Sequence, residues 1–337
     1  MSNHSCPVVP VTLTAHPNAD KLAMVNGILG GYNCGVSKSE FEGVTKAAFI
    51  PPDSLIPVDR ECFQFLRGLA FKEGHPYAGL ARVTVKRFRG VYSDGLLVKV
   101  PDDMEVGTDA AEFLGVQHYE PVNDPAWAGN HLSGDAEGID GFGAKYDIEN
   151  LKRYSTTFAP GEQVVVTEKI HGCNARYAFR DGRHWCGSRS HWKKAEPENV
   201  WWLAKTPEME ALLANHPDLV LFGEVYGKVQ KGFLYDAPEG GQKFVAFDLW
   251  SASTNRWLEY AEFSELCRRY EIPTAPLLYE GPFDLTHMAQ LSEGPSTMGV
   301  APCREGVVVR SVPEKWNVSL GRHQLKMVGN GYLELKD

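Results

Sequence analysis

The sequence predicts an α+β protein of two domains, with an all-β domain at the N-terminus and a mixed domain at the C-terminus. Its 337 residues suit two domains at roughly 150 residues each. Short apolar segments broken by turn residues fill 8–115, whereas strand and helix patterns alternate from about residue 148. Between them the chain is rich in Gly, Asp, Asn and Pro. We therefore expect domains at 1–120 and 148–337, joined by a linker at 121–147.

The N-terminal domain contains several apolar runs with the length of strands. They lie at 8–15, 23–36, 45–57, 80–88 and 95–101. Short strands at such close spacing predict a small barrel or sandwich.

The C-terminal domain alternates strands with helices. Strand patterns occupy 163–169, 219–225, 243–250 and 306–310. Thr206, followed by Pro207 and early acidic residues, predicts the start of a helix that ends near His216. A second helix fits residues 260–270.

Composition excludes several classes of protein. The formal net charge of −9 provides no global basic surface for nucleic acid, although a local groove stays possible. The longest apolar runs are too short for a membrane span, and the first residues lack a secretory pattern, so we expect a cytoplasmic protein with no membrane partner. Seven scattered cysteines without a C-x-x-C pair predict reduced thiols and no zinc ribbon.

Lys169 is the first candidate for chemistry. It lies at the end of the apolar strand 163–169 and is followed closely by Gly172. Desolvation and cationic neighbours there can depress the pKa of a lysine and make it a nucleophile. The alternative is that Lys169 only ends a strand with its ammonium group in solvent.

Charged and aromatic residues follow at other strand ends. Glu224 and Glu305 can place two carboxylates around one site with Lys169, which suits a nucleoside triphosphate and a divalent metal. Phe247 offers an aromatic face for a base. Taken singly, such glutamates are usually solvated and such a phenylalanine is usually core.

Five segments in this order resemble the motifs of the covalent nucleotidyltransferase superfamily, which contains ATP-dependent ligases and RNA capping enzymes. They are K-x-H-G-x-N at 169–174, F-G-E-V-Y-G at 222–227, F-x-A-F-D at 244–248, E-G-V-V at 305–308 and the segment around Lys326. His171 in the first motif is typical of the RNA-ligase form, although it also fits a structural hydrogen bond. Only 11 residues follow Lys326, which favours an RNA ligase over relatives with a domain after this motif.

The N-terminal half resembles the OB-type domain of the Deinococcus-type nick-sealing RNA ligases. The similar segments are H-P-N-A-D-K-L at 16–22, I-P-P-D-S at 50–54 and R-F-R-G-V-Y-S-D-G at 87–95. The first string also occurs in tRNA-binding OB modules, and Pro17-Asn18 is in any case a turn signal. The resemblance implies an all-β OB-type barrel followed by an α+β nucleotidyltransferase domain built on antiparallel sheets.

The resemblance also implies a reaction. Lys169 attacks the α-phosphate of ATP to give a lysyl-AMP, the AMP passes to a 5′-phosphate end, and a 3′-hydroxyl displaces AMP to seal a nick in a duplex whose 3′-OH strand is RNA. Glu224 and Glu305 would hold Mg²⁺ or Mn²⁺ through water. We expect the enzyme to be a monomer.

The remaining roles follow from the same resemblance. Lys326 would contact the α-phosphate, Phe247 would stack on adenine and Arg189 would lie near the ribose or the departing phosphates. Other nucleotide-binding candidates are Glu168, Ile170, Asn174 and Glu224, and less specific candidates are His171, Asp248 and Arg322. RNA ligases often have K-x-K where this chain has Gln324 and Lys326, and Arg322 is the residue expected to compensate.

A basic segment in the N-terminal domain is the candidate surface for nucleic acid. Arg82, Lys86, Arg87 and Arg89 lie in one predicted strand, with Arg87 and Arg89 on one face and Arg82 on the other. A charged, solvated edge strand is the alternative.

Two other functions stay open from the sequence. One is a capping-type guanylyltransferase, which would use GTP. The other is a non-catalytic protein that binds tRNA or another nucleic acid through its N-terminal domain.

Overall fold

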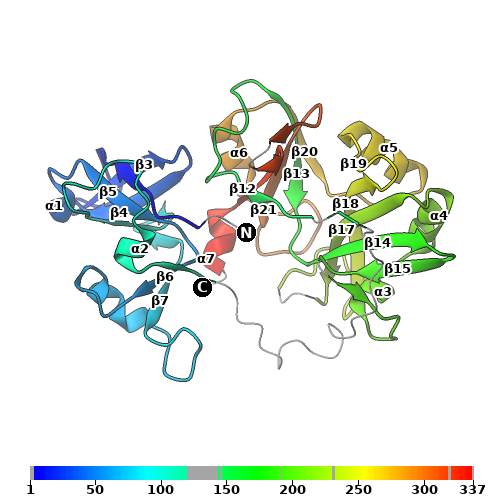
Figure 1. Cartoon of the computed structure of the whole chain (residues 1–337), viewed down its shortest axis with the longest axis horizontal. Helices are drawn as coiled ribbons and strands as arrows, with labels where there is room; N and C mark the ends of the chain where they lie inside the picture. Colours follow the sequence, from blue (N-terminus) through cyan, green and yellow to red (C-terminus); the bar gives the residue numbers. More distant parts are fainter. Residues whose placement is uncertain are drawn as a thin grey trace. The chain divides into compact units, whose positions relative to one another are not determined.

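The computed structural model describes residues 4–119, 143–144, 146–189, 191–229, 232–317 and 320–335. Most of the predicted linker at 121–147 therefore lies outside the described residues. The chain forms two compact units, whose elements are labelled in Figure 1. The first unit comprises Met1–Val122, Leu151–Thr156 and Asn330–Asp337, and the second comprises Asn123–Asn150 and Thr157–Gly329.

The first unit consists mainly of short strands. Its sheets are β1(Val8–Pro10), β5(Lys46–Ile50) and β10(Leu96–Val98); β2(Leu13–Ala15), β3(Leu22–Ile28) and β4(Tyr32–Ser37); β11(Gln117–His118), β6(Ser54–Pro57) and β7(Leu80–Val83); and the hairpin β8(Lys86–Phe88) with β9(Val91–Ser93). Its helices are α1(Lys38–Phe41), the 3₁₀ helix η1(Glu61–Leu69), α2(Ala111–Leu114) and α7(Asn330–Leu335). The described strands of this unit form separate sheets and no closed barrel.

Strand β5 is the centre of the first unit. It pairs with β1 on one side and β10 on the other, and its last four residues are fully buried. Successive side chains of a strand point to opposite faces. Ala48 and Ile50 therefore join one apolar cluster, while Ala47 and Phe49 join a second.

The predicted single strand at 80–88 is wrong, because two strands occupy it. β7 pairs with β6, whereas β8 pairs with β9, so the two lie in different sheets. The alternation that would place Arg87 and Arg89 on one face and Arg82 on the other therefore does not continue through the segment. Arg89 lies beyond β8, in the turn to β9.

The second unit contains two larger sheets. The five-stranded sheet has the order β12(Glu149–Asn150), β24(Gln324–Val328), β21(Gly306–Ser311), β13(Gln163–Lys169), β20(Leu277–Pro282). The six-stranded sheet has the order β16(Trp192–Lys193), β15(Arg183–Gly187), β14(Cys173–Arg180), β17(Leu219–Gly227), β18(Gln242–Ser251), β19(Arg256–Trp257), and β22(Trp316–Asn317) pairs with β23(Gly321–Arg322). The mixture of helices with a majority of strands confirms the coarse fold class that the sequence predicts.

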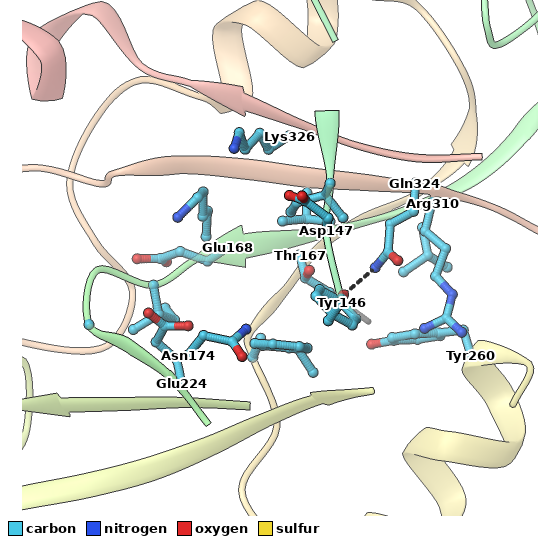
Figure 2. Close-up of a pocket in the computed structure, with 18 of the residues that line it drawn as sticks. Tyr146, Asp147, Thr167, Glu168, Asn174, Glu224, Tyr260, Arg310, Gln324 and Lys326 are labelled. Atoms are coloured by element: carbon cyan, nitrogen blue, oxygen red, sulfur yellow. Dashed lines mark hydrogen bonds between the residues drawn. The ribbon is translucent and has the colours of Figure 1, made fainter. Parts of the chain in front are cut away.

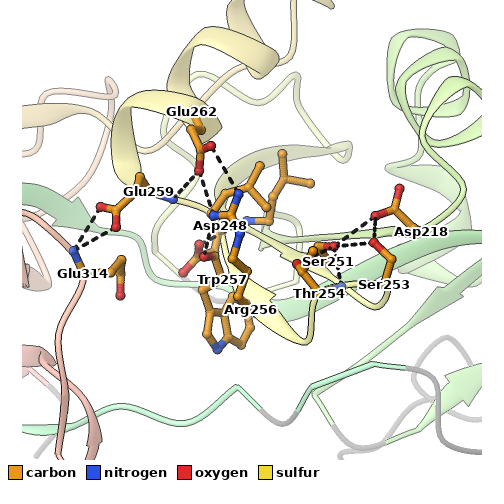
Figure 3. Close-up of polar contacts among 12 residues, drawn as sticks. Asp218, Asp248, Ser251, Ser253, Thr254, Arg256, Trp257, Glu259, Glu262 and Glu314 are labelled. Atoms are coloured by element: carbon orange, nitrogen blue, oxygen red, sulfur yellow. Dashed lines mark hydrogen bonds and ion pairs between the residues drawn. The ribbon is translucent and has the colours of Figure 1, made fainter.

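The helices of the second unit are α3(Val200–Leu203), α4(Pro207–Asn215), α5(Tyr260–Arg269) and α6(Leu285–Leu291). The two predicted helices are present as α4 and α5, the first of which was predicted from its capping signals. Thr206 Oγ1 accepts a hydrogen bond from the Met209 N–H, as an N-cap residue does. At α5 the Glu262 carboxylate accepts from the Glu259 N–H and pairs with Arg256 (Figure 3).

None of the helices in the described residues is both long and apolar enough to cross a membrane. All seven cysteines are free thiols.

Two segments that the sequence places in the C-terminal domain belong to the first unit by their contacts. These are Leu151–Thr156 and the segment that contains α7, which is red in Figure 1. The ammonium of Lys152 lies 3.3 Å from Asp94 Oδ1 and 3.0 Å from Asn330 Oδ1. Asp94 is 1% exposed, so a buried ion pair and its neighbouring hydrogen bond hold both segments to the first unit.

We predict that Asp94→Asn destabilises the first unit by about 3 kcal/mol, because it leaves the ammonium of Lys152 buried without its counter-charge. Urea denaturation followed by circular dichroism, with native-state hydrogen exchange to resolve the first unit, measures the change, because the described tryptophans all lie in the second unit. Arg268→Ala, which breaks an exposed pair with Glu265, is the control and should leave the midpoint nearly unchanged. Equal effects of the two substitutions would contradict the prediction.

Candidate active site

The register of the five-stranded sheet determines which side chains share one face. Thr167 on β13 pairs with Val308 on β21, which pairs with Lys326 on β24. Two residues further along the strands, Val165, Arg310 and Gln324 pair in the same way. Since side chains alternate along a strand, both rows point to the same face of the sheet.

That face forms part of a cavity of about 310 Å³ within the second unit (Figure 2). The six-stranded sheet contributes Asn174, Glu224 and Phe247 to the lining. The sequence-predicted residues at the cavity are Glu168, Lys169, Ile170, Asn174, Arg189, Glu224, Phe247 and Lys326. Glu305, His171, Asp248 and Arg322 are not part of its lining.

Lys169 lies where two strand ends meet. It pairs with Gly306, the first residue of β21, so Glu305 immediately precedes the paired position. Its Nζ lies 2.8 Å from Glu305 Oε1. Burial lowers the pKa of Lys169, but Glu305 and Glu224 outweigh burial and raise the pKa above its ordinary value. The expectation of a depressed pKa is therefore wrong for the protein alone, because the neighbours of Lys169 are carboxylates as well as Lys326.

Glu224 is the second carboxylate of the site. It follows Gly223 on β17 and pairs across the sheet with Asn174 on β14. Burial, together with the charge of Glu305, raises the pKa of Glu224 to about 8 even though Lys169 lowers it. Near neutral pH this carboxyl group therefore holds a proton for much of the time.

Gly172 explains part of the spacing of the first motif. A Cβ atom at this position would lie 2.2 Å from the carbonyl oxygen of Val225 and 2.9 Å from Glu224 Cγ. The backbone that follows Lys169 therefore packs directly on β17 with no room for a side chain. This contact brings Lys169 and Glu224 to the same end of the cavity.

Besides Lys169 and Arg310, which is paired with Asp248, the cationic residues of the lining are Lys326 and Arg189. Burial and then the charge of Lys169 lower the pKa of Lys326. Arg189 is more than half exposed, and its guanidinium lies 3.7 Å from Asp147. Both side chains can therefore meet an anionic ligand without first breaking a buried ion pair.

Phe247 reaches the cavity because of a β-bulge. Phe222 pairs with Asp248 and Gly223 pairs with Ala246, so Phe247 is the extra residue on β18. Bulges re-aim side chains in this way. Its ring contacts that of Tyr146 at 4.7 Å between centroids, and Tyr146 lines the cavity too.

Asp248 and Arg322 lie outside the cavity lining and pair with each other in a buried cluster of charged residues. Asp248 is fully buried, its Oδ2 accepts from Arg322 at 2.6 Å, and its Oδ1 lies 3.4 Å from Arg310. Arg322 also pairs with Glu314, which lies beside Asp248 in Figure 3. The guanidinium of Arg322 is therefore already neutralised, and its expected role as a substitute phosphate ligand does not fit this arrangement.

Glu168 lines the cavity, but its carboxylate is bound elsewhere. It accepts hydrogen bonds from Ser296 Oγ at 2.5 Å and from Thr297 N and Oγ1 at 2.9 and 2.6 Å. Arg304 Nε lies 3.5 Å from the same group. Only the backbone of Glu168 is therefore available to a nucleoside, because the side chain points to the loop that contains Ser296 and Thr297.

His171 contacts the metal candidate Glu305 rather than the cavity. Its Nδ1 lies 3.8 Å from Glu305 Oε2, and its ring packs on the edge of Phe233. The backbone N–H of His171 donates to the hydroxyl of Tyr235 at 2.8 Å. This environment suits a residue that positions the loop.

The basic candidates lie in the first unit and do not form one cluster. Arg82 pairs with Asp53 at 2.6 Å and stacks on Tyr119. Arg87 lies 3.7 Å from Glu334, in α7. Lys86 and Arg89 are exposed.

Sequence reasoning missed several lining residues. Tyr146, Asp147, Tyr260, Arg310 and Gln324 all face the cavity (Figure 2). The hydroxyl of Tyr146 accepts a hydrogen bond from Gln324 Nε2 at 2.9 Å. Alternation from Lys326 would have found Gln324, and alternation from Val308 would have found Arg310. No sequence signal singles out Tyr146, which lies within the predicted linker.

Two carboxylates beside Lys169, those of Glu224 and Glu305, are the ligands that the site offers to a divalent cation. No group of three or more His, Cys, Asp or Glu side chains in the described part of the chain can hold a metal ion. Glu305 Oε2 is buried without a hydrogen-bond partner in the structure, and Glu224 lies close enough to interact with Glu305. Two carboxylates fit Mg²⁺ or Mn²⁺ that keeps water and takes its remaining ligands from substrate phosphates.

Residues 162–328 match the family model for RNA ligase. No curated protein matches the chain significantly. A Naegleria gruberi RNA ligase structure with PPi is 23% identical, with a TM-score of 0.75 over 99% of this chain and 98% of that chain. A variant of the same ligase with ATP and Mn is 22% identical, with a TM-score of 0.76 over 98% of each chain.

The match defines the class of protein: the chain is a ligase enzyme. The matched family is the RNA ligases, and the matched residues include Lys169, Glu224, Phe247, Glu305 and Lys326. The structural similarity shows that the fold of the Naegleria enzyme extends over nearly the whole chain.

We predict that Glu224→Gln stabilises the metal-free protein progressively as the pH rises. The folded-state pKa of about 8 exceeds the unfolded value of 4.5, so the wild type loses stability from about pH 4.5 to pH 8 as this carboxyl group ionises. The amide cannot ionise. Thermal unfolding in EDTA should show a difference in Tm that is small at pH 5 and reaches a few degrees at pH 9. A difference that is constant with pH would contradict the assignment.

Proposed function

We propose that this protein is an ATP-dependent RNA ligase that seals 3′-OH/5′-phosphate nicks in duplex nucleic acid through a lysyl-AMP and an adenylylated 5′ end. One observation carries the proposal. Lys169 lies at the cavity with its Nζ 2.8 Å from Glu305, and Lys326 and Phe247 line the same cavity within the segment that matches RNA ligases.

In the first step Lys169 Nζ loses its proton and attacks the α-phosphate of ATP. The Nζ–P bond forms, and the bond from the α-phosphorus to the bridging oxygen breaks to release pyrophosphate. The N–P bond then breaks as AMP moves to a 5′-phosphate oxygen of the nick. Attack by the 3′-hydroxyl finally forms the phosphodiester and releases AMP.

Phosphoryl transfer of this kind depends mostly on positioning and charge neutralisation. Lys326 supplies a positive charge for the α-phosphate, and Arg189 can meet the ribose or the departing phosphates. Asn174 offers an amide whose Oδ1 is buried without a partner in the described part of the chain. Phe247 provides a stacking face for adenine, and such stacking is worth about 1–3 kcal/mol per base.

Glu224 and Glu305 are the residues that would hold Mg²⁺ or Mn²⁺. When bound, the ion neutralises phosphate charge in the transition state. These two carboxylates raise the pKa of Lys169 in the protein alone. If the two carboxylates bound a metal ion, they would no longer hold the pKa of Lys169 above its ordinary value. Metal binding and loss of the proton from Lys169 are therefore linked. A variant of the Naegleria ligase was solved with ATP and Mn, which supports a divalent cation as part of the proposed reaction.

The first unit is proposed to bind the duplex as an OB-type module. Its short antiparallel strands and the exposed basic residues near β8 suit the phosphate backbone. The structural similarity to the Naegleria RNA ligase covers both units of this chain, which supports a role for both units in the proposed ligation.

We predict that the wild type becomes labelled by α-³²P-ATP in the presence of magnesium and that Lys169→Met does not. The label should survive denaturation and be removed by pyrophosphate, which reverses formation of the N–P bond. Lys243→Met, at an exposed lysine paired with Asp236, is the control and should label like the wild type.

Other outcomes of this experiment have distinct meanings. Label from GTP but not from ATP would replace the proposal with a capping-type guanylyltransferase. No label from either nucleotide would overturn the ligase mechanism and favour a non-catalytic nucleic-acid-binding protein.

Nick sealing needs its own measurement. The enzyme should join a 3′-OH RNA strand to a 5′-phosphate across a nick faster than it joins the same strands without a complementary splint. Equal rates on the two substrates would contradict the duplex assignment.

A further inference from the structure

The loop that joins β2 to β3 contacts the tip of the β8–β9 hairpin through two of its residues. His16 Nε2 lies 3.1 Å from the carbonyl oxygen of Phe88. Asn18 Nδ2 donates to the carbonyl oxygen of Arg89 at 2.9 Å. The conspicuous string H-P-N-A-D-K-L thus has a defined neighbour, which the proposed reaction does not use.

The ring of His16 is held in one tautomer. Its Nδ1 accepts a hydrogen bond from the backbone N–H of Asn18 at 3.1 Å, so this nitrogen carries no proton. Nε2 therefore carries the proton and donates a hydrogen bond to the carbonyl oxygen of Phe88. His16 is 6% exposed, so water competes little for either bond.

The hairpin tip that these residues hold has a strained backbone. Arg89 has a φ of +48° and Gly90 has a φ of +90°, the left-handed pair of a two-residue hairpin turn. Asparagine and glycine favour such a turn, whereas arginine does not. The two carbonyl groups that His16 and Asn18 bind are those of Phe88 and Arg89, so the loop stabilises the residue that is strained. Backbone strain persists where its surroundings over-determine it, and it collects at functional positions.

Arg89 differs from Arg82 and Arg87 in having no counter-charge among the described residues. Arg82 is paired with Asp53, and Arg87 lies beside Glu334. No ion pair of Arg89 occurs among the residues that the structure describes, and its side chain is exposed. Phe88 beside it is 41% exposed.

We propose that His16 and Asn18 are positioning residues that hold the β8–β9 turn so that Arg89 contacts the phosphate backbone of a nucleic-acid duplex. This inference rests on the proposed function. It assigns the contact to Arg89, whereas the paired Arg82 and Arg87 serve mainly to stabilise the unit. It also gives the H-P-N string a role in substrate binding without direct contact with substrate.

The test is equilibrium binding of the full-length protein to a nicked RNA duplex with a 5′-OH, which cannot be sealed. Each phosphate contact contributes about 0.9 to the slope of log K against log salt concentration. Arg89→Ala should lower that slope by about one and weaken binding roughly three- to tenfold near 0.1 M salt. Arg268→Ala, at an exposed arginine of α5, is the matched control and should behave like the wild type.

Asn18→Ala distinguishes positioning from general stability, because Asn18 is exposed and its loss should not unfold the unit. It should lower the salt slope like Arg89→Ala, and the double variant should bind no more weakly than Arg89→Ala alone. His16→Gln, which keeps a donor for Phe88, should bind better than His16→Leu. Effects of Asn18→Ala and Arg89→Ala that multiply would overturn the inference, and so would an unchanged slope in Arg89→Ala.

Labelling by ATP separates this inference from the proposed function. All these variants should form lysyl-AMP at the wild-type rate, since none of the substituted residues lines the cavity that contains Lys169. Absence of label in the wild type would count against the proposed ligase, whereas normal label with an unchanged salt slope would count against the role of the hairpin alone.

Discussion

The pairing of β13 with β21 is the constraint on which the rest of the site depends. It places Lys169 opposite Gly306 and thus next to Glu305, and it aligns Thr167 with Val308 and Lys326. A shift of one residue would turn every one of these side chains to the other face of the sheet. The apolar residues of β13 prevent such a shift, because Val164 and Val166 are fully buried on the face away from Thr167. The chemistry is therefore held in register by core packing.

The same site carries an electrostatic cost in the free protein. A lysine and two carboxylates share a small volume, burial and Glu305 keep Glu224 partly protonated, and one oxygen of Glu305 has no described hydrogen-bond partner. Such groups are stabilised better by a ligand than by one another. The arrangement therefore favours the nucleotide-bound state over the free one, in keeping with a site whose first task is to bind a polyanion together with a cation.

Much of this could be predicted from the sequence because the motif residues lie on strands, whose side chains alternate between two faces, although only Lys169 is at a strand end. Lys169, Glu224 and Lys326 follow that logic, and they meet at one cavity. Phe247 could be chosen only by resemblance, since its orientation comes from a bulge that strand periodicity does not indicate. The pKa of Lys169 was predicted in the wrong direction, because its sign depends on how close two distant carboxylates come. The prediction of one basic strand was also wrong. Neither the break between β7 and β8 nor the pairing of Arg82 with Asp53 is indicated by the local sequence.

The path of the chain between the two units has a consequence for how the protein can be divided. The backbone leaves the first unit after Val122, returns for Leu151–Thr156, leaves again and returns at Asn330. Lys152 of the first return segment bonds Asp94 and also Asn330 of the second, so both return segments are held to the first unit. A single cut in the predicted linker would therefore not yield two complete modules. Separation would require a permuted gene in which these two segments are rejoined to the N-terminal chain, and the ligase domain is better regarded as an insertion than as an appended module.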